Sequence, residues 1–381
     1  MSTASPNVDT LFPYSTIVAM NIVQLTEVQS GCYKWRGAIP AKYLRQRGHR
    51  VEIFSGGTQS YQVPDAMVFF RTHFMETYKL VEECRRHSVR IVFDTDDALD
   101  LVPKENLNHA SLQLKIPVFE FLLREADVVT TTTPTLAEHL RRWSSNVVVI
   151  PNSVDPDEWK PVPKSAGVRV GWTGSPTHFV DLSVALDAIR KLQKQYSFTF
   201  VLQGICNETS LDELQEILVA SWGKAYFNSA AGKPMKHFLS QLSEIRYEFH
   251  PYVPIDLHPQ KVCDLGLDIG IAPLIGDRFN ENKSCIKYYE YAMSGAVTVA
   301  SKVLPYSTEV PITAKNNRES WIAQLEQTLN ADRAALAREQ QEWVMTHRNI
   351  QKNVALWEQA LSGGTGTNDA SAQESAPSVG A

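Results

Sequence analysis

The sequence predicts an α/β protein built from two Rossmann-like domains, whose parallel sheets face each other across a cleft. Three observations lead to this fold class. Short runs rich in Val and Ile alternate with helical patterns, which is typical of parallel sheets covered on both faces. The alternation stops in a proline-containing segment at 155–167 and then starts again. The length of 381 residues is sufficient for two such domains.

The first half of the chain, 15–154, contains the elements of one domain. Apolar runs predict strands at 15–23, 49–56, 65–71, 89–94, 127–132 and 146–152. Apolar positions at helical spacing predict helices at 39–48, 75–87, 112–126 and 135–143. Gly48 is expected to end the first helix, because glycine readily adopts the left-handed conformation found there. We assign this half to the N-terminal Rossmann-like domain.

The second half begins after a linker at 155–167, which carries three prolines and no apolar period. Strands are predicted at 168–174, 198–204, 247–253, 267–273 and 296–301. Helices are predicted at 180–195, from about Ser284, and onward to about Leu361. We place the C-terminal domain at 168–340 and a last helix at 341–361. A position of this helix against the N-terminal domain is one alternative. Residues 1–14 and the low-complexity tail 362–381 are expected to be disordered.

Composition and charge narrow the classes of partner and compartment. A net charge of -5 gives no sign of nucleic-acid binding, so no nucleic-acid partner is expected. The five cysteines are scattered and lack Cys-x-x-Cys spacing, which argues against a disulfide framework and a zinc site. No signal peptide or membrane span is evident. We expect a cytoplasmic protein and keep peripheral contact with the inner face of the membrane as an alternative.

The segment richest in chemistry runs from Asp268 to Ser301. A strand, a polar loop and a helix follow one another, and Ser284 is a suitable N-cap for that helix. Lys283, Lys287 and Glu290 then share one helix face near its N-terminus. Two cations at a positive helix end suit a diphosphate, and a carboxylate one turn further suits a ribose diol. A solvated Lys/Glu helix face is an equally good explanation of the composition alone.

This segment resembles the donor-binding region of retaining GT-B glycosyltransferases, specifically the family 4-like group. "EYAMSGAVTVAS" is similar to the second half of the family's Glu-x7-Glu element, so Glu290 corresponds to the glutamate that binds the donor ribose. The first glutamate falls at Asn282, with Glu281 beside it, and the chain departs from the pattern there. A subgroup with "N-x-x-K-S-x-I-K-x-x-E-Y" is nearer. It is matched by Asn280, Lys283, Ser284, Ile286, Lys287, Glu290 and Tyr291.

Further stretches extend the resemblance from about Ile17 to Leu361. "VRVGWTGSPTHFVDL" resembles the first strand and loop of the family's donor domain, where Gly174 and Ser175 let the backbone approach the diphosphate. Thr177 and His178 would open the next helix toward the cleft, and a solvent-exposed helix start is the alternative for His178. His250 and Tyr252 follow the strand around which the donor base packs in this family. They are therefore candidates for base contacts, although Tyr252 suits a core position equally well.

The N-terminal domain is the acceptor domain in the resembled family. Arg36 lies in the loop after the first strand. Arg71 and His73 lie at the carboxyl end of the third strand. His109 in "NLNHASL" is a further candidate, for which a structural role is the main alternative. "FDTDDALD" places the remaining candidates, Asp94, Asp96 and Asp97, after the fourth strand. An Asp-x-Asp motif can hold a metal on a diphosphate, but the donor motifs occur some two hundred residues later, so we expect these aspartates to face the acceptor or organise the loop.

The resemblance implies transfer of a sugar from a nucleotide-diphosphate sugar to a glycan, lipid or small-molecule acceptor, with retention and without a metal or bound cofactor. Lys283 and Lys287 would stabilise the leaving diphosphate. Either Asn282, or Glu281 through a shifted loop, would take the polar role of the missing glutamate toward the sugar. Two alternatives remain open. One is a GT-B nucleotide-sugar epimerase, and the other is a protein that only binds nucleotide sugars.

Overall fold

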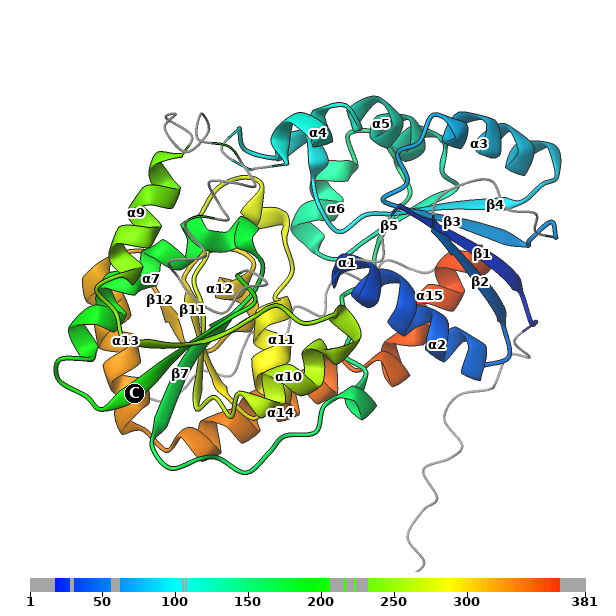
Figure 1. The fold of residues 1–381 in the computed structure, drawn as a ribbon. Coiled ribbons are helices and arrows are strands. Elements are labelled where there is room, and N and C mark those ends of the chain that lie inside the picture. The colour runs from blue at the N-terminus through cyan, green and yellow to red at the C-terminus, as the bar shows by residue number, and fades with distance from the viewer. Residues whose placement is uncertain are drawn as a thin grey trace, which may run out of the picture.

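The computed structural model describes residues 18–363, apart from 28–30, 56–61, 105, 107, 206–215, 217–222 and 224–231. The termini expected to be disordered lie outside the described residues, except for Ser362 and Gly363. So do the first residues of the strand predicted at 15–23, which is observed from Asn21. Within these limits the chain forms two α/β halves side by side, each with one sheet (Figure 1).

The N-terminal sheet has six parallel strands in the order β2-β1-β3-β4-β5-β6. The strands are β1 (Asn21–Thr26), β2 (Arg50–Ser55), β3 (Ala66–Phe70), β4 (Arg90–Asp94), β5 (Val128–Thr131) and β6 (Val147–Val149). The helices are α1 (Gly31–Tyr33), a π-helix (Lys34–Ala38), α2 (Ile39–Gln46), α3 (Glu76–Arg86), a 3-10 turn (Leu99–Leu101), α4 (His109–Gln113), α5 (Ile116–Glu125) and α6 (Pro134–Leu140). Gly48 follows α2 with a φ of +95°, as predicted for a helix end.

The C-terminal sheet also has six parallel strands, in the order β12-β11-β10-β7-β8-β9. The strands are β7 (Val168–Thr173), β8 (Phe198–Gln203), β9 (Tyr247–His250), β10 (Ile269–Ala272), β11 (Val297–Ser301) and β12 (Thr313–Ala314). The helices are α7 (Phe179–Leu192), α9 (Lys233–Leu242), α10 (His258–Asp264), α11 (Ile286–Met293), α12 (Tyr306–Glu309) and α13 (Arg318–Asn330). Short 3-10 turns lie at Pro156–Glu158, Pro176–His178, Ile255–Leu257 and Asn280–Asn282.

Both sheets are buried on their two faces, which explains the continuous Val/Ile runs of the sequence. Every residue of β3 and of β11 is buried. On one face of the N-terminal sheet, Phe93 of β4 packs edge-on against Phe119 of α5, with ring centroids 5.7 Å apart. In the C-terminal half, Trp172 and Trp321 are completely buried in the core between the sheet and α7, α9 and α13.

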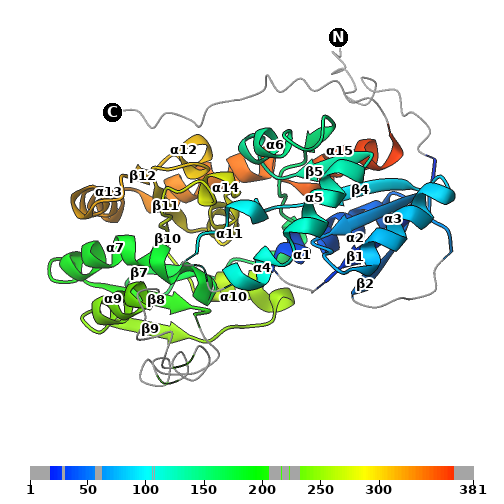
Figure 2. The ribbon, with the colours of Figure 1, turned by 90° about the horizontal axis from the view of Figure 1, so that it is seen from above.

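The region predicted as one helix over 341–361 is two helices, α14 (Arg333–His347) and α15 (Ile350–Ser362). The chain leaves the helical conformation at Asn349, whose side chain then caps α15 by accepting a hydrogen bond from Gln351 N. α15 crosses to the N-terminal half and packs against α2 (Figures 1 and 2). There Glu358 pairs with Arg47 at 2.6 Å and with His49 at 3.0 Å.

The strand orders define where a ligand can approach each sheet. In the C-terminal sheet the chain reverses direction across the sheet between β7 and β10, and in the N-terminal sheet it does so between β1 and β3. Ligands of open α/β sheets bind beyond the carboxyl ends of the strands at such switch points. Residues that directly follow these four strands are therefore the first candidates for function. Seen from above, α1 and α4 lie where the two halves meet (Figure 2).

Candidate functional site

A lysine and a glycine form a cradle at the switch point of the C-terminal sheet. Lys287 lies in the first turn of α11, and its Nζ donates to the carbonyl of Thr173 at the end of β7, 2.6 Å away. The same Nζ lies 5.0 Å from the centre of the Trp172 ring. A Cβ at Gly174 would come within 2.8 Å of Lys287 Nζ, so only glycine leaves this space open. Burial lowers the pKa of Lys287, although the negative charges of Glu290 and Asp181 act to raise it.

The N-terminus of α11 adds a positive end to this cradle. Cys285, not Ser284, occupies the N-cap position, and no side chain caps the helix. The hydroxyl of Ser284 instead accepts a hydrogen bond from Asn152 of the N-terminal half at 2.8 Å. The predicted capping role of Ser284 is therefore wrong, because the serine is used to join the two halves. The N-cap side chain thus leaves the first N–H groups of α11 without a capping hydrogen bond, and such groups favour an anion.

Lys283 extends the cationic group toward the other half of the molecule. Its ammonium lies 4.5 Å from the centre of the Phe279 ring and 3.8 Å from the Asp97 carboxylate, which belongs to the loop after β4. The Asp97 side chain is 14% exposed and that of Lys283 is 23% exposed. Burial acts to raise the pKa of Asp97, but the charges of Lys283 and Arg71 outweigh it and lower the pKa. The two halves thus meet through opposite charges beside the cradle.

Asn282 is buried and has an unpaired acceptor. Its amide nitrogen donates to Arg278 O at 2.6 Å, and its backbone carbonyl accepts from Thr133 of the N-terminal half at 3.2 Å. The Oδ1 atom has no hydrogen-bond partner in the described part of the chain. Because an unsatisfied buried acceptor is costly, this oxygen is available to a ligand hydroxyl group.

His178 and Asp181 form a second polar pair at the start of α7. His178 Nδ1 lies 2.8 Å from one Asp181 oxygen, and the other oxygen accepts from Ile275 N at 2.8 Å. Asn280 also donates to Asp181, at 3.4 Å. Burial lowers the pKa of His178, opposed by its hydrogen bond to Asp181. The sequence interpretation missed Asp181, although its spacing of three residues from His178 at a helix start was a usable signal.

This pair lines a pocket of about 250 Å³ between the two halves. Pro103 and Asn106 of the N-terminal half line one side of the pocket. The start of α7 and the loop after β10 line the other side. Thr177, Phe279 and Lys283 also line it, so the predicted residues Thr177, His178 and Lys283 come together here. Ser175 and Thr177 are exposed, and their hydroxyl groups lie 2.8 Å apart. The pocket combines apolar rings with a few polar groups, as small-molecule sites commonly do.

Glu290 lies one turn beyond Lys287 on α11 and is buried. Its carboxylate lies 3.2 Å from Nε2 of His258, at the start of α10. The sequence interpretation did not identify His258, and no local pattern connects it to a residue 32 positions later. Ile286 is half-buried against the hydrophobic core, so it supports α11 and offers no polar group to a ligand.

The two candidates for base contacts differ in their surroundings. Both ring nitrogens of His250 already have partners, Glu248 at 2.6 Å and Lys261 at 2.9 Å. Tyr252 is 51% exposed, which rules out the alternative that it belongs to the core. Of the two, Tyr252 has the accessible surface that stacking on a base requires.

Arg36 and Asp94 do not face a ligand, contrary to the prediction for the acceptor side. Their side chains are fully buried and form a two-point ion pair, with Nη2–Oδ2 and Nε–Oδ1 distances of 2.6 and 3.0 Å. Arg36 also donates to Ile150 O at 2.5 Å and lies over the Trp357 ring at 4.7 Å. Thr130 donates to Asp94 at 2.6 Å. The pair therefore joins α15 to the N-terminal sheet and has a structural role.

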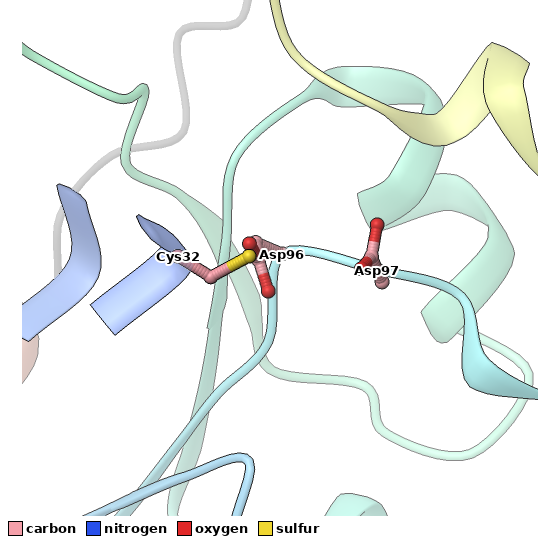
Figure 3. A group of neighbouring side chains, drawn as sticks. All are labelled: Cys32, Asp96 and Asp97. Carbon is pink, nitrogen blue, oxygen red and sulfur yellow. The ribbon is translucent and has the colours of Figure 1, made fainter. Parts of the chain in front are cut away.

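Asp96 and Asp97 lie beyond β4 beside Arg71, which has an unusual φ of +47°. Arg71 Nε lies 3.0 Å from Asp96, and Arg71 Nη2 contacts Asp97. Oxygens of both carboxylates and the Cys32 sulfur lie within 4.8 Å of one another, a spacing that a metal ion can bridge. Figure 3 shows Cys32 and Asp96 pointing toward each other from α1 and from the loop after β4.

This cluster is poorly suited to a metal in the state that the structure shows. Arg71 already pairs with both carboxylates and offsets one of their two charges. Burial raises the pKa of the Cys32 thiol well above its usual value, so without a metal the sulfur is protonated. His109, the last acceptor-side candidate, uses Nδ1 to contact Val102 O at 2.9 Å, which fits its structural alternative.

Comparisons with known proteins give a clear result for the fold alone. No family model matches the chain, and no curated protein sequence matches it. An alpha-glucosyltransferase solved in complex with UDP and a 13-mer DNA shares 13% identity, with a TM-score of 0.63 over 91% of this chain and 100% of that one. HepE from Anabaena, solved in complex with UDP, shares 12% identity, with a TM-score of 0.59 over 90% of this chain and 100% of that one. TarM shares 12% identity, with a TM-score of 0.54 over 78% of this chain and 54% of that one.

These neighbours and the two parallel sheets show that the chain has the GT-B fold, as predicted. They also overturn one expectation. We excluded nucleic-acid partners from the net charge, but a protein of this fold was solved bound to DNA. Net charge is therefore no basis for that exclusion. Among the described residues, no helix is long and apolar enough to cross a membrane.

Proposed function

We propose that the chain is a glycosyltransferase that moves a sugar from a UDP-sugar to an acceptor hydroxyl group. The observation that carries this proposal is the cradle of Lys287, Gly174 and the uncapped N-terminus of α11 at the switch point of the C-terminal sheet. It offers a cation, open space and backbone donors, which are the features that bind a diphosphate. Solved proteins of the same fold that hold UDP support this choice of ligand.

We assign a role to each residue from its chemistry and its free surface. Lys287 and Lys283 would stabilise the negative charge that develops on the UDP leaving group as its bond to the sugar breaks. Glu290, one turn further along α11, would accept hydrogen bonds from the ribose. The free Oδ1 of Asn282 would hold a hydroxyl group of the sugar. The exposed ring of Tyr252 would stack on the base.

In the proposed reaction the acceptor oxygen bonds to the anomeric carbon while the bond to the β-phosphate oxygen breaks. The acceptor's proton passes to the leaving phosphate. We further propose that the anomeric configuration of the sugar is retained, because the resembled family retains it. We also propose that no metal is needed, because cations already surround the cradle. Addition of EDTA should then leave turnover within twofold of the untreated rate. If EDTA abolished turnover and Mg²⁺ or Mn²⁺ restored it, the proposal that no metal is needed would be contradicted.

The decisive experiment measures binding and consumption of the donor. We expect UDP to bind more tightly than GDP or ADP in titration calorimetry, and a UDP-sugar to be consumed with release of UDP. Lys287→Met keeps the aliphatic stem beside Trp172 but removes the charge, so turnover should fall about 100-fold, a typical loss for one oxyanion-stabilising group. Lys352→Met is a matched control, because Lys352 is exposed on α15, which packs against the N-terminal half.

The same assay separates the alternatives. An epimerase would convert the donor to an isomer without an acceptor, and a binding protein would release no UDP. The acceptors offered should include simple glycosides, glycerol and hydroxymethylated DNA, since a protein of this fold was solved with DNA containing an HMU base. Wild-type turnover by Lys287→Met, with unchanged affinity for UDP, would contradict the assigned role of the cradle.

A further inference from the structure

A histidine of the N-terminal half has a buried nitrogen without a partner. His73 lies shortly after β3, and its backbone N–H donates to Glu27 Oε1 at 2.8 Å, while Nδ1 lies 3.1 Å from the same oxygen. Glu27 also pairs with Lys115. The His73 side chain is only 3% exposed, yet its Nε2 has no hydrogen-bond partner in the described part of the chain. A buried polar atom of this kind is costly and needs an explanation.

Glu27 fixes the chemical character of this nitrogen. Burial would raise the pKa of Glu27, but hydrogen bonds from His73 and Lys115 lower it to about 2, so Glu27 is ionised at neutral pH. An ionised carboxylate only accepts hydrogen bonds, and Nδ1 must therefore carry the proton. Burial lowers the pKa of His73 despite its bond to Glu27, which keeps the imidazole neutral. Nε2 is then a lone-pair acceptor, held in a fixed orientation.

The position of His73 connects it to the cleft. Glu27 directly follows β1, and Arg71 and His73 follow β3, so the group lies at the switch point of the N-terminal sheet. Arg71, two residues before His73, contacts Asp97. Asp97 in turn lies 3.8 Å from Lys283 of the donor half. A ligand that extends from Lys283 into the N-terminal half therefore approaches the loop that carries His73.

We propose that, before transfer, His73 Nε2 accepts a hydrogen bond from the acceptor hydroxyl group that receives the sugar, and that Glu27 is the positioning residue that sets the tautomer of His73. As the sugar is transferred, this hydroxyl group breaks its hydrogen bond to His73 and passes its proton to the leaving phosphate. This inference rests on the proposed glycosyltransferase function. It also restricts the class of acceptor. A neutral lone-pair acceptor attracts a hydroxyl donor and repels the oxygens of a phosphate or carboxylate, so the acceptor atom is a hydroxyl oxygen and not an anionic one.

The test compares two substitutions with the wild-type protein. In His73→Asn the amide nitrogen replaces Nδ1 toward Glu27, but no atom replaces Nε2. In His73→Phe the ring volume remains without either nitrogen, which covers the case in which the asparagine variant does not fold. Release of UDP from UDP-glucose would be measured with water alone, with glycerol and with methyl α-glucoside, and affinity for UDP by calorimetry.

We expect both variants to release UDP about 100-fold more slowly with every hydroxyl probe, because a misplaced nucleophile costs about this factor. Their affinity for UDP should stay within twofold, since the cradle lies in the other half. His139→Asn is a matched control, because His139 pairs with Asp100 at 2.8 Å and has no part in the site. It should keep the wild-type rate.

Two outcomes would overturn the inference. One is UDP release by a folded His73 variant within twofold of the wild-type rate. The other is a loss of UDP affinity that accounts for the loss of turnover. Failure of the proposed function is recognised separately, because the wild-type protein would then neither bind UDP nor release it from any UDP-sugar.

Discussion

Gly174 lies so close to Lys287 that its substitution by alanine is a test of the donor cradle. A Cβ at this position would lie 2.6 Å from the Trp172 ring and 2.8 Å from Lys287 Nζ. Gly174→Ala should therefore displace the lysine and weaken UDP binding at least tenfold, or about 1.4 kcal/mol. Calorimetry measures the affinity, and a thermal melt shows whether the fold is kept. Unchanged UDP affinity in a folded variant would mean that the diphosphate binds elsewhere.

A second residue-scale prediction concerns acid stability. The pKa of Glu27 is lowered to about 2 from an ordinary value of 4.5, because hydrogen bonds from His73 and Lys115 outweigh burial. A carboxyl group with a lowered pKa stabilises the fold above its ordinary value, and this contribution is lost as the pH falls from about 4.5 toward 2. We expect Glu27→Gln to remove about 2 kcal/mol of stability at pH 7 and much less at pH 3.

Urea unfolding at several pH values measures this effect. The free energy of unfolding of the wild-type protein should fall below pH 4.5, and the difference between wild type and Glu27→Gln should shrink over the same range. A difference that stays constant from pH 7 to pH 3 would show that the glutamate contributes by packing and not by charge.

The sequence predicted which types of residue form the site, but not which of their side chains are buried. Gly174 directly follows a strand and Lys283 and Lys287 lie at the start of a helix, and the structure brings them to the same region. Arg36 and Asp94 also follow or end strands, yet they pair with each other inside the protein. Whether a charged side chain points into a cleft or into the core depends on partners far away in the sequence, here Ile150 and Trp357. The sequence likewise does not show that Nδ1 of His73 meets Glu27, 46 residues earlier in the chain.

At the scale of elements, the alternation of strands and helices was largely predictable, because both sheets are parallel and buried. The exceptions have physical reasons. The helix predicted over 341–361 breaks at Asn349, where a capping side chain and a bridge to Val154 replace helical hydrogen bonds. The short helix α10 and the two-residue strand β12 were not predicted, since so few residues show no measurable period.

The last helix gives the prediction at this scale. Trp357 of α15 is 3% exposed and lies under the buried Arg36 guanidinium at 4.7 Å. Trp357→Ala should therefore remove both core packing and a contact of the buried ion pair, at a cost of about 3–5 kcal/mol. Lys352→Ala on the exposed side of α15 is the matched control and should cost less than 0.5 kcal/mol. Urea unfolding distinguishes the two, and equal effects would show that α15 does not anchor the N-terminal half.

At the scale of the whole molecule, the two halves are connected through the edges of the site. Asn152 donates to Ser284, Thr133 donates to the carbonyl of Asn282, and Lys283 lies near Asp97. Each of these contacts joins the N-terminal half to the segment 282–284, directly before α11. The same segment leads into the donor cradle, so the relative position of the halves is set next to the proposed reaction centre.

This arrangement predicts that donor binding and transfer can be separated by mutation. Asn152→Ala removes the 2.8 Å hydrogen bond to Ser284 and a longer one, 3.3 Å, from Arg36, but it leaves Lys287 and Gly174 unchanged. Affinity for UDP should stay within twofold, because UDP would contact the C-terminal half alone. The rate of UDP release from a UDP-sugar should fall about tenfold, since transfer requires the acceptor and donor sites to be held in register. A parallel loss of UDP affinity would instead show that the N-terminal half forms part of the nucleotide site.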